Sequence, residues 1–145
     1  MFQHLFIFQP GLWIGEGKLT FNTSSETLRF FTKWTVSSLV QDEIHTFQQV
    51  EMESVTEQMR NHFRFFDITP TSFSLELENE TMGKVSGIGV IEQNKIAWEF
   101  RSDTLEGFEV YIFNPELEEY ALHAEFSSSE DFRTIIDGKI WKKTT

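Results

Sequence analysis

The stretch LWIGEGKLTF, at residues 12–21, decides the fold of this chain. Apolar or small residues occupy every second position: Trp13, Gly15, Gly17, Leu19 and Phe21. The positions between them include Glu16, Lys18 and Thr20. A period of two is typical of a half-buried antiparallel strand, because successive side chains point to opposite faces. We therefore predict that the face carrying Trp13 looks toward a core.

Similar runs continue along the whole chain. We predict ten strands, at residues 12–21, 27–37, 43–53, 58–68, 72–77, 84–91, 95–102, 108–113, 118–126 and 132–141. Turn-forming residues separate them, as at Thr69-Pro70, Glu106-Gly107 and Asn114-Pro115. Residues 56–62 could instead begin as a helical turn. Because the links are short, consecutive strands must pair antiparallel as hairpins.

A ten-strand open meander would leave two unpaired edges, whereas pairing the first strand with the last removes both. We therefore predict an all-β fold: a single antiparallel up-and-down meander closed into a barrel of about ten strands, with no helical lid. The 145 residues suit one domain spanning 1–145, in which residues 1–10 cover one mouth of the barrel.

Composition excludes several classes of function. The formal net charge is −11, and the 12 Lys and Arg are scattered singly, so neither nucleic acid nor an anionic membrane surface is an expected partner. No apolar stretch approaches the ~20 residues that span a bilayer. The chain has no Cys, which suits a reducing compartment. With no signal-peptide pattern before Leu5, we expect a soluble cytoplasmic protein whose mature chain starts at Met1.

The alternation assigns an inner face to each run. The residues predicted to point inward in the later runs include Ile88, Val90, Val110, Ile112, Ala121, His123, Thr134, Ile136 and Ile140. Polar residues also fall on inward positions: Thr32, Thr46, Gln48, Asn61, Ser86, His123 and Thr134. A barrel of this size either holds a small ligand or is filled by its own side chains and water. Both alternatives are open at this point.

The leading functional hypothesis is binding or carriage of a small hydrophobic or amphipathic molecule inside the barrel. The predicted ligand-binding residues are Trp13, Thr32, Trp34, Gln48, Phe63, Phe65, Trp98, Phe100 and His123. Aromatic walls with a few polar groups are the usual make-up of such a site. The alternative is a small enzyme of the isomerase or cyclase type, with His123 as the base. No nucleophile elbow or phosphate-binding loop is present.

The outward faces carry Phe31, Phe47 and Phe66 on neighbouring predicted strands. This cluster predicts a homodimer contact or a ligand-free protein-interaction module, unless a bulge has shifted the alternation. His45 and His62 fall on outward faces as well, and no pair of His shows metal spacing. We therefore expect no metal site. The paired carboxylates are expected to be solvated surface charge.

Gly11-Leu12-Trp13 resembles the glycine, any residue, tryptophan motif of the first lipocalin strand, and Gly11 to Gly17 resembles the first strand of nitrobindin-like proteins in the calycin superfamily. The resemblance implies an up-and-down barrel with Trp13 at its closed end, under a basic residue such as Arg133 or Lys139. Haem-binding nitrobindins ligate iron through a histidine on the last strand. Here the nearest candidate is His123, on the penultimate strand, so we expect no cofactor, with haem bound through His123 as the alternative.

Overall fold

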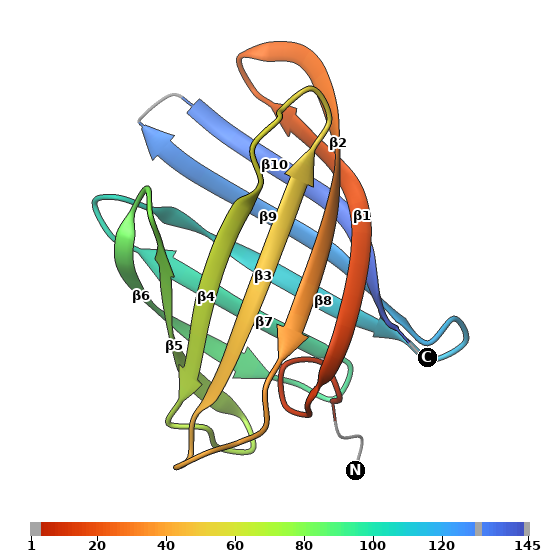
Figure 1. The fold of residues 1–145 in the computed structure, drawn as a ribbon, viewed down its shortest axis with the longest axis vertical. Helices are drawn as coiled ribbons and strands as arrows, with labels where there is room; N and C mark the ends of the chain where they lie inside the picture. Colours follow the sequence, from red (N-terminus) through yellow and green to blue (C-terminus); the bar gives the residue numbers. More distant parts are fainter. Residues whose placement is uncertain (1–3, 130–131, 144–145) are drawn as a thin grey trace.

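The computed structural model describes residues 4–129 and 132–143. It contains ten strands: β1 (Gly11–Phe21), β2 (Ser24–Val36), β3 (Ile44–Met52), β4 (Met59–Phe66), β5 (Ser72–Asn79), β6 (Gly83–Ile91), β7 (Lys95–Arg101), β8 (Glu106–Asn114), β9 (Glu119–Ser129) and β10 (Phe132–Lys142). All pair antiparallel with their sequence neighbours, and β1 also pairs with β10. The predicted closed meander is confirmed (Figure 1).

The seam between β1 and β10 runs from Trp13 opposite Lys142 to Phe21 opposite Thr134. Closure depends on small residues here, because Gly17 of β1 lies opposite Gly138 of β10. A Cβ atom at Gly17 would meet the Gly138 Cα at 2.7 Å and the Phe30 ring at 2.6 Å. The alternating glycines of the first strand thus allow the last strand to pack closely against it.

The segment before β1 closes the end of the barrel near both chain termini in Figure 1. Phe6 and Ile7 are both 0% exposed. The Phe6 ring lies 5.2 Å from Trp13, 5.3 Å from Trp34 and 4.9 Å from Tyr111. Ile7 has a φ of 62°, which is costly for a β-branched residue. The buried packing of residues 4–10, which we call the plug, offsets that strain.

Above the plug, aromatic rings fill the barrel. Trp34 lies 5.2 Å from Phe63 and 6.4 Å from Trp98, and Trp98 lies 5.1 Å from Tyr111. Such tilted and edge-on contacts add to the free energy gained by burying aromatic area. No helix long and apolar enough to cross a membrane occurs in the part of the chain that the structure describes.

The predicted inner face of β6 is wrong. Ile88 and Val90 are 62% and 48% exposed, and Ser86 is exposed as well, whereas Gly87 and Gly89 point inward. The reason is space: a Cβ atom at Gly89 would overlap the Phe73 ring, and one at Gly87 would meet Phe100. The inner face of this strand therefore carries two glycines beside the buried Val85, and Ile88 and Val90 face solvent.

The inner faces of β8 and β9 are also opposite to the prediction. Val110 and Ile112 point outward, Ile112 being 46% exposed, while Glu109 and Tyr111 are buried. On β9 the buried residues are Tyr120, Leu122 and Ala124, so Ala121 and His123 face outward. On β10 the prediction holds for Ile140, which is 0% exposed.

Trp13 lies at the closed end, but neither predicted basic residue packs on it. The Lys139 ammonium lies 5.7 Å from the Trp141 ring, and Arg133 bonds Glu125 near the opposite end of the barrel. The Trp13 ring packs instead on Phe6 and Tyr120, at 5.2 and 5.6 Å. The plug thus occupies the place expected for the cation.

Candidate functional site at the open end of the barrel

Burial of the inward side chains falls steadily from the plugged end to the other. On β3, Ile44 and Thr46 are buried, whereas Gln48, Val50 and Met52 are half-buried. On β4, Phe65 and Phe63 are buried, Asn61 is half-buried and Met59 is exposed. Inward side chains can meet solvent only through the barrel mouth, so this end is open to solvent.

A ladder of side-chain amides crosses the inner face of β2 to β5 at this level. Gln48 Nε2 donates to Thr32 Oγ1 at 3.1 Å, Asn61 Nδ2 donates to Gln48 Oε1 at 2.8 Å, and Asn79 Nδ2 donates to Asn61 Oδ1 at 3.0 Å. The Asn79 oxygen accepts from the backbone amides of Thr81 and Met82. Each amide keeps donor or acceptor capacity, so the ladder can still bind a polar group.

A hollow of about 600 Å³ opens at the rim beside the end of this ladder. Its lining residues come from the link before β4, from β4 and from the β5–β6 turn: Thr56, Glu57, Gln58, Met59, Arg60, Asn79, Glu80 and Thr81. Asn79 belongs to both the ladder and the hollow. A polar route therefore leads from the rim to the inner face.

A buried carboxyl lies deeper, among the aromatic rings. Glu109 is 9% exposed; its Oε1 accepts from the Tyr111 hydroxyl at 2.7 Å and its Oε2 from Trp98 Nε1 at 2.9 Å. Burial raises the pKa of Glu109 from its ordinary 4.5 to about 6, although both hydrogen bonds act in the opposite direction. The Glu109 carboxyl therefore changes charge in the mildly acidic pH range.

Two further polar atoms of the interior lack a hydrogen-bond partner among the described residues. They are Trp34 Nε1 and Thr46 Oγ1, and both residues are 0% exposed. Buried polar groups are nearly always satisfied in folded proteins, so such orphans call for an explanation.

The structure brings most predicted ligand-binding residues to one interior. Trp13, Thr32, Trp34, Phe63, Phe65, Trp98 and Phe100 are each at most 5% exposed, and Gln48 is half-buried on the same inner face. The hydrogen bonds of the ladder depend on the register between strands, which the sequence does not reveal. Glu109 was not among the predicted inward residues, because its apolar neighbours on β8 suggested the opposite face.

His123 is the exception, and its predicted inward position is wrong. Its side chain is 42% exposed, with Nδ1 2.6 Å from Asp137 and Nε2 3.0 Å from Glu125. The hydrogen bond to Asp137, followed by that to Glu125, raises the pKa of His123. Because the barrel wall separates this ring from the interior, His123 can act neither as a base nor as a haem ligand inside the barrel.

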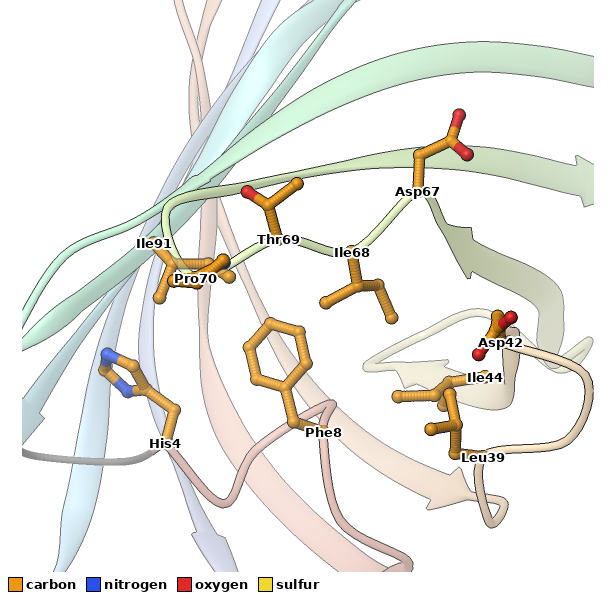
Figure 2. A pocket seen from close by; sticks show the side chains of 10 residues that line it. All are labelled: His4, Phe8, Leu39, Asp42, Ile44, Asp67, Ile68, Thr69, Pro70 and Ile91. Carbon is orange, nitrogen blue, oxygen red and sulfur yellow. The ribbon is translucent and has the colours of Figure 1, made fainter.

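A second hollow, of about 760 Å³, lies at the plugged end (Figure 2). It is lined by His4, Phe8, Leu39, Asp42, Ile44, Asp67, Ile68, Thr69, Pro70 and Ile91. In Figure 2, Phe8 occupies the middle, with His4 on one side and both aspartates on the other.

His4 ties the plug to the barrel beside this hollow. Its Nε2 lies 2.7 Å from the carbonyl oxygen of Glu92, which only accepts, so Nε2 donates. Its Nδ1 lies 2.7 Å from the Tyr120 hydroxyl, which then donates to it. Burial lowers the pKa of His4, so the ring stays neutral in this tautomer.

Comparison with known proteins places the fold but no family. No family model matches the chain, and no curated protein matches it. A solved structure that is similar is the S-type phycobiliprotein lyase from Guillardia theta, with a TM-score of 0.70 and 7% identity over 94% of this chain and 89% of that one. The two proteins share a barrel fold of the lipocalin-like kind.

Proposed function

We propose that this protein binds a small hydrophobic or amphipathic ligand through the open end of its barrel. The observation that carries the proposal is the fall in burial along β3, from Ile44 and Thr46 to Gln48, Val50 and Met52. An accessible inner face above a closed aromatic floor, with Val50 and Met52 beside the Gln48 amide, offers the combination of apolar area and a few polar groups that small-molecule sites use.

The side chains suggest how affinity and selectivity arise. Phe30 and Phe100, on opposite walls, offer buried aromatic surface, and Leu19, Phe126 and Ile136 add apolar area that is only partly buried. The amide ladder beginning at Thr32 and Gln48 would bind the polar end of the ligand. Burial of apolar area supplies affinity at ~25 cal/mol per Å², and the polar groups select the ligand.

The fold of the structural neighbour supports this function. That neighbour is named for its action on phycobiliproteins, so a bilin is one ligand to try here. Calycin membership, suggested by Gly11-Leu12-Trp13 on β1 and by the ten-strand barrel, is part of the same proposal. So is the organisation of the chain as one domain with residues 1–10 as a cap.

The test is a titration of tryptophan fluorescence, with native mass spectrometry, across fatty acids, an isoprenoid, haem and a linear tetrapyrrole. Gln48→Leu removes the middle of the ladder and should weaken a bound ligand ~10-fold, the loss of one hydrogen bond. Gln49→Leu, on the exposed face of the same strand, is the matched control. If no compound binds, or if both variants bind like wild type, the proposal fails.

The hollow at the plugged end is the second candidate site, favoured by its volume of about 760 Å³ and its apolar lining. Phe8→Ala separates the two. The ring packs edge-on against Phe73 at 5.9 Å and occupies the middle of this hollow. A ligand lost in Phe8→Ala but kept in Gln48→Leu would move the function to the plugged end.

A further inference from the structure

Two histidine rings meet on the outer face of the barrel. His45 on β3 and His62 on β4 are diagonal neighbours, since His45 lies opposite Arg64 and His62 lies opposite Phe47. His45 Nδ1 and His62 Nε2 are 2.8 Å apart, and the two side chains are 40% and 32% exposed. The pair is therefore accessible from solvent.

Each ring has a carboxylate near its other nitrogen. His45 Nε2 lies 3.5 Å from Glu43 Oε1, and His62 Nδ1 lies 3.8 Å from Glu78 Oε1. When two neutral rings share one hydrogen bond, the donor ring has its lone pair on the outer nitrogen, facing its carboxylate. That lone pair and the carboxylate repel each other. A cation bound between the rings would remove this repulsion, because both inner nitrogens would bind the cation and both outer nitrogens would carry hydrogen toward a carboxylate.

We propose that His45 and His62 bind a divalent transition-metal ion between β3 and β4. Nitrogen ligands at ~2.0–2.1 Å from one ion, in adjacent positions at a right angle, lie ~3 Å apart. The two nitrogens are 2.8 Å apart in a hydrogen bond, with their rings 21° from parallel, so binding an ion would require the rings to turn their lone pairs toward it while the nitrogens move little. Imidazole suits Ni²⁺, Cu²⁺ and Zn²⁺.

The surroundings match those of metal-binding histidines. A carboxylate that is hydrogen-bonded to the outer nitrogen fixes the tautomer and strengthens the ligand. Glu43 and Glu78 lie 3.5 and 3.8 Å from these nitrogens, so each could form such a bond after a small movement. Phe47 stacks on His62 at 4.6 Å with only 7° between the planes, which restricts the rotation of that ring. The nearby Arg64 is paired at 2.7 Å with the second oxygen of Glu43.

The described residues contain no group of three or more His, Asp or Glu arranged to hold a metal ion, so water would complete the coordination. The site is on the outside of the barrel, and it does not depend on the proposed ligand site. The sequence led us to expect no metal site, because the spacing of His45 and His62 along the chain does not show that β3 and β4 pair in the register that brings the two rings together.

The test is calorimetric titration of the untagged, metal-free protein with Ni²⁺ at pH 7.5. Wild type should bind one ion, and His45→Gln or His62→Gln should weaken binding at least ~10-fold. Glu78→Gln should weaken it less than either. His123→Gln is the matched control, since that ring also lies outside but bonds two carboxylates through both nitrogens; its affinity should equal that of wild type.

Location is tested separately by paramagnetic broadening of amide signals, which should be confined to β3 and β4 around the two rings. Circular dichroism of each variant verifies the fold. Two results would overturn the proposal. If wild type binds no Ni²⁺, the two rings are joined only by their hydrogen bond. If the double variant His45→Gln, His62→Gln binds Ni²⁺ as tightly as wild type, the ion is adventitious.

Discussion

Replacing the buried Glu109 by Gln should make the protein more stable at neutral pH. The carboxyl pKa is raised from 4.5 to about 6 by burial, so the folded state holds its proton more tightly than the unfolded chain does. The contribution of protonated Glu109 is therefore fully present below pH 4.5, and it is lost as the pH rises through 6. At ~1.4 kcal/mol per pKa unit, the loss is ~2 kcal/mol.

Glutamine reproduces the protonated carboxyl. Its oxygen can accept from Trp98 Nε1, which only donates, and its amide can donate to the Tyr111 hydroxyl. The variant should thus resemble wild type at pH 4 and exceed its free energy of unfolding by up to ~2 kcal/mol at pH 7. Tyr111 does not titrate between pH 4 and 7, because burial raises its pKa well above the ordinary value of a tyrosine.

Urea unfolding, followed by tryptophan fluorescence at pH 4, 5, 6 and 7, measures the difference between variant and wild type. Other titrating groups cancel in that difference. Glu106→Gln, at an exposed residue of the same strand, is the matched control for the loss of one carboxylate. A flat difference for Glu109→Gln, or one that falls as the pH rises, would refute the reasoning.

Three other changes test the fold. Phe6→Ala empties the plug beneath Trp13 and Trp34 and should cost ~3–5 kcal/mol in urea unfolding; a loss below 1 kcal/mol would contradict the plug. Gly89→Ala places a methyl group against the Phe73 ring and should lower stability by ~1–3 kcal/mol, whereas an unchanged thermal midpoint would show that the ring moves freely. His123→Gln removes the imidazolium bonded to Asp137 and Glu125. Because the pKa of His123 is raised in the folded state, its stabilising contribution is present below pH 6.5 and is lost as the pH rises through the folded-state pKa. The free energy of unfolding of wild type should therefore exceed that of the variant at pH 6 and approach it at pH 9. The opposite trend would disprove the pairing of His123 with the two carboxylates.

The topology could be predicted from the sequence because turn chemistry and alternation reinforce each other. Short links such as Thr69-Pro70 leave no choice but hairpins, and the Trp13 face of β1 is consistently small or apolar. Closure followed from the cost of free edges. These are local signals, which a single sequence carries in full.

The faces of the later strands could be predicted only in part. On β6 the apolar residues Ile88 and Val90 are outside, because Gly87 and Gly89 leave space inward for aromatic rings of neighbouring strands. That packing is not encoded locally. On β9, by contrast, the signal was present: Tyr120, Leu122 and Ala124 alternate with Glu119, Ala121, His123 and Glu125, and they are the buried set.

The polar part of the candidate site depends on register. Thr32 and Gln48 were predicted as polar groups of the interior, and their hydrogen bond to each other follows from the pairing of β2 with β3. Asn61 and Asn79 join only because β3 pairs with β4 and β4 with β5. Glu109 was missed for another reason: rules of burial place carboxylates outside, and only two specific donors make this one tolerable inside.

The pairing of β1 with β10 has a consequence for synthesis on the ribosome. Trp13 finds its partner Lys142 only after almost the entire barrel has been translated. Until then β1 and the newest strand each expose unpaired amides and carbonyls to other nascent chains. Joining residues so distant along the chain is slow, and a delay at this last step prolongs the aggregation-prone stage. Conditions that hasten release of the final strand should therefore raise the yield of folded protein.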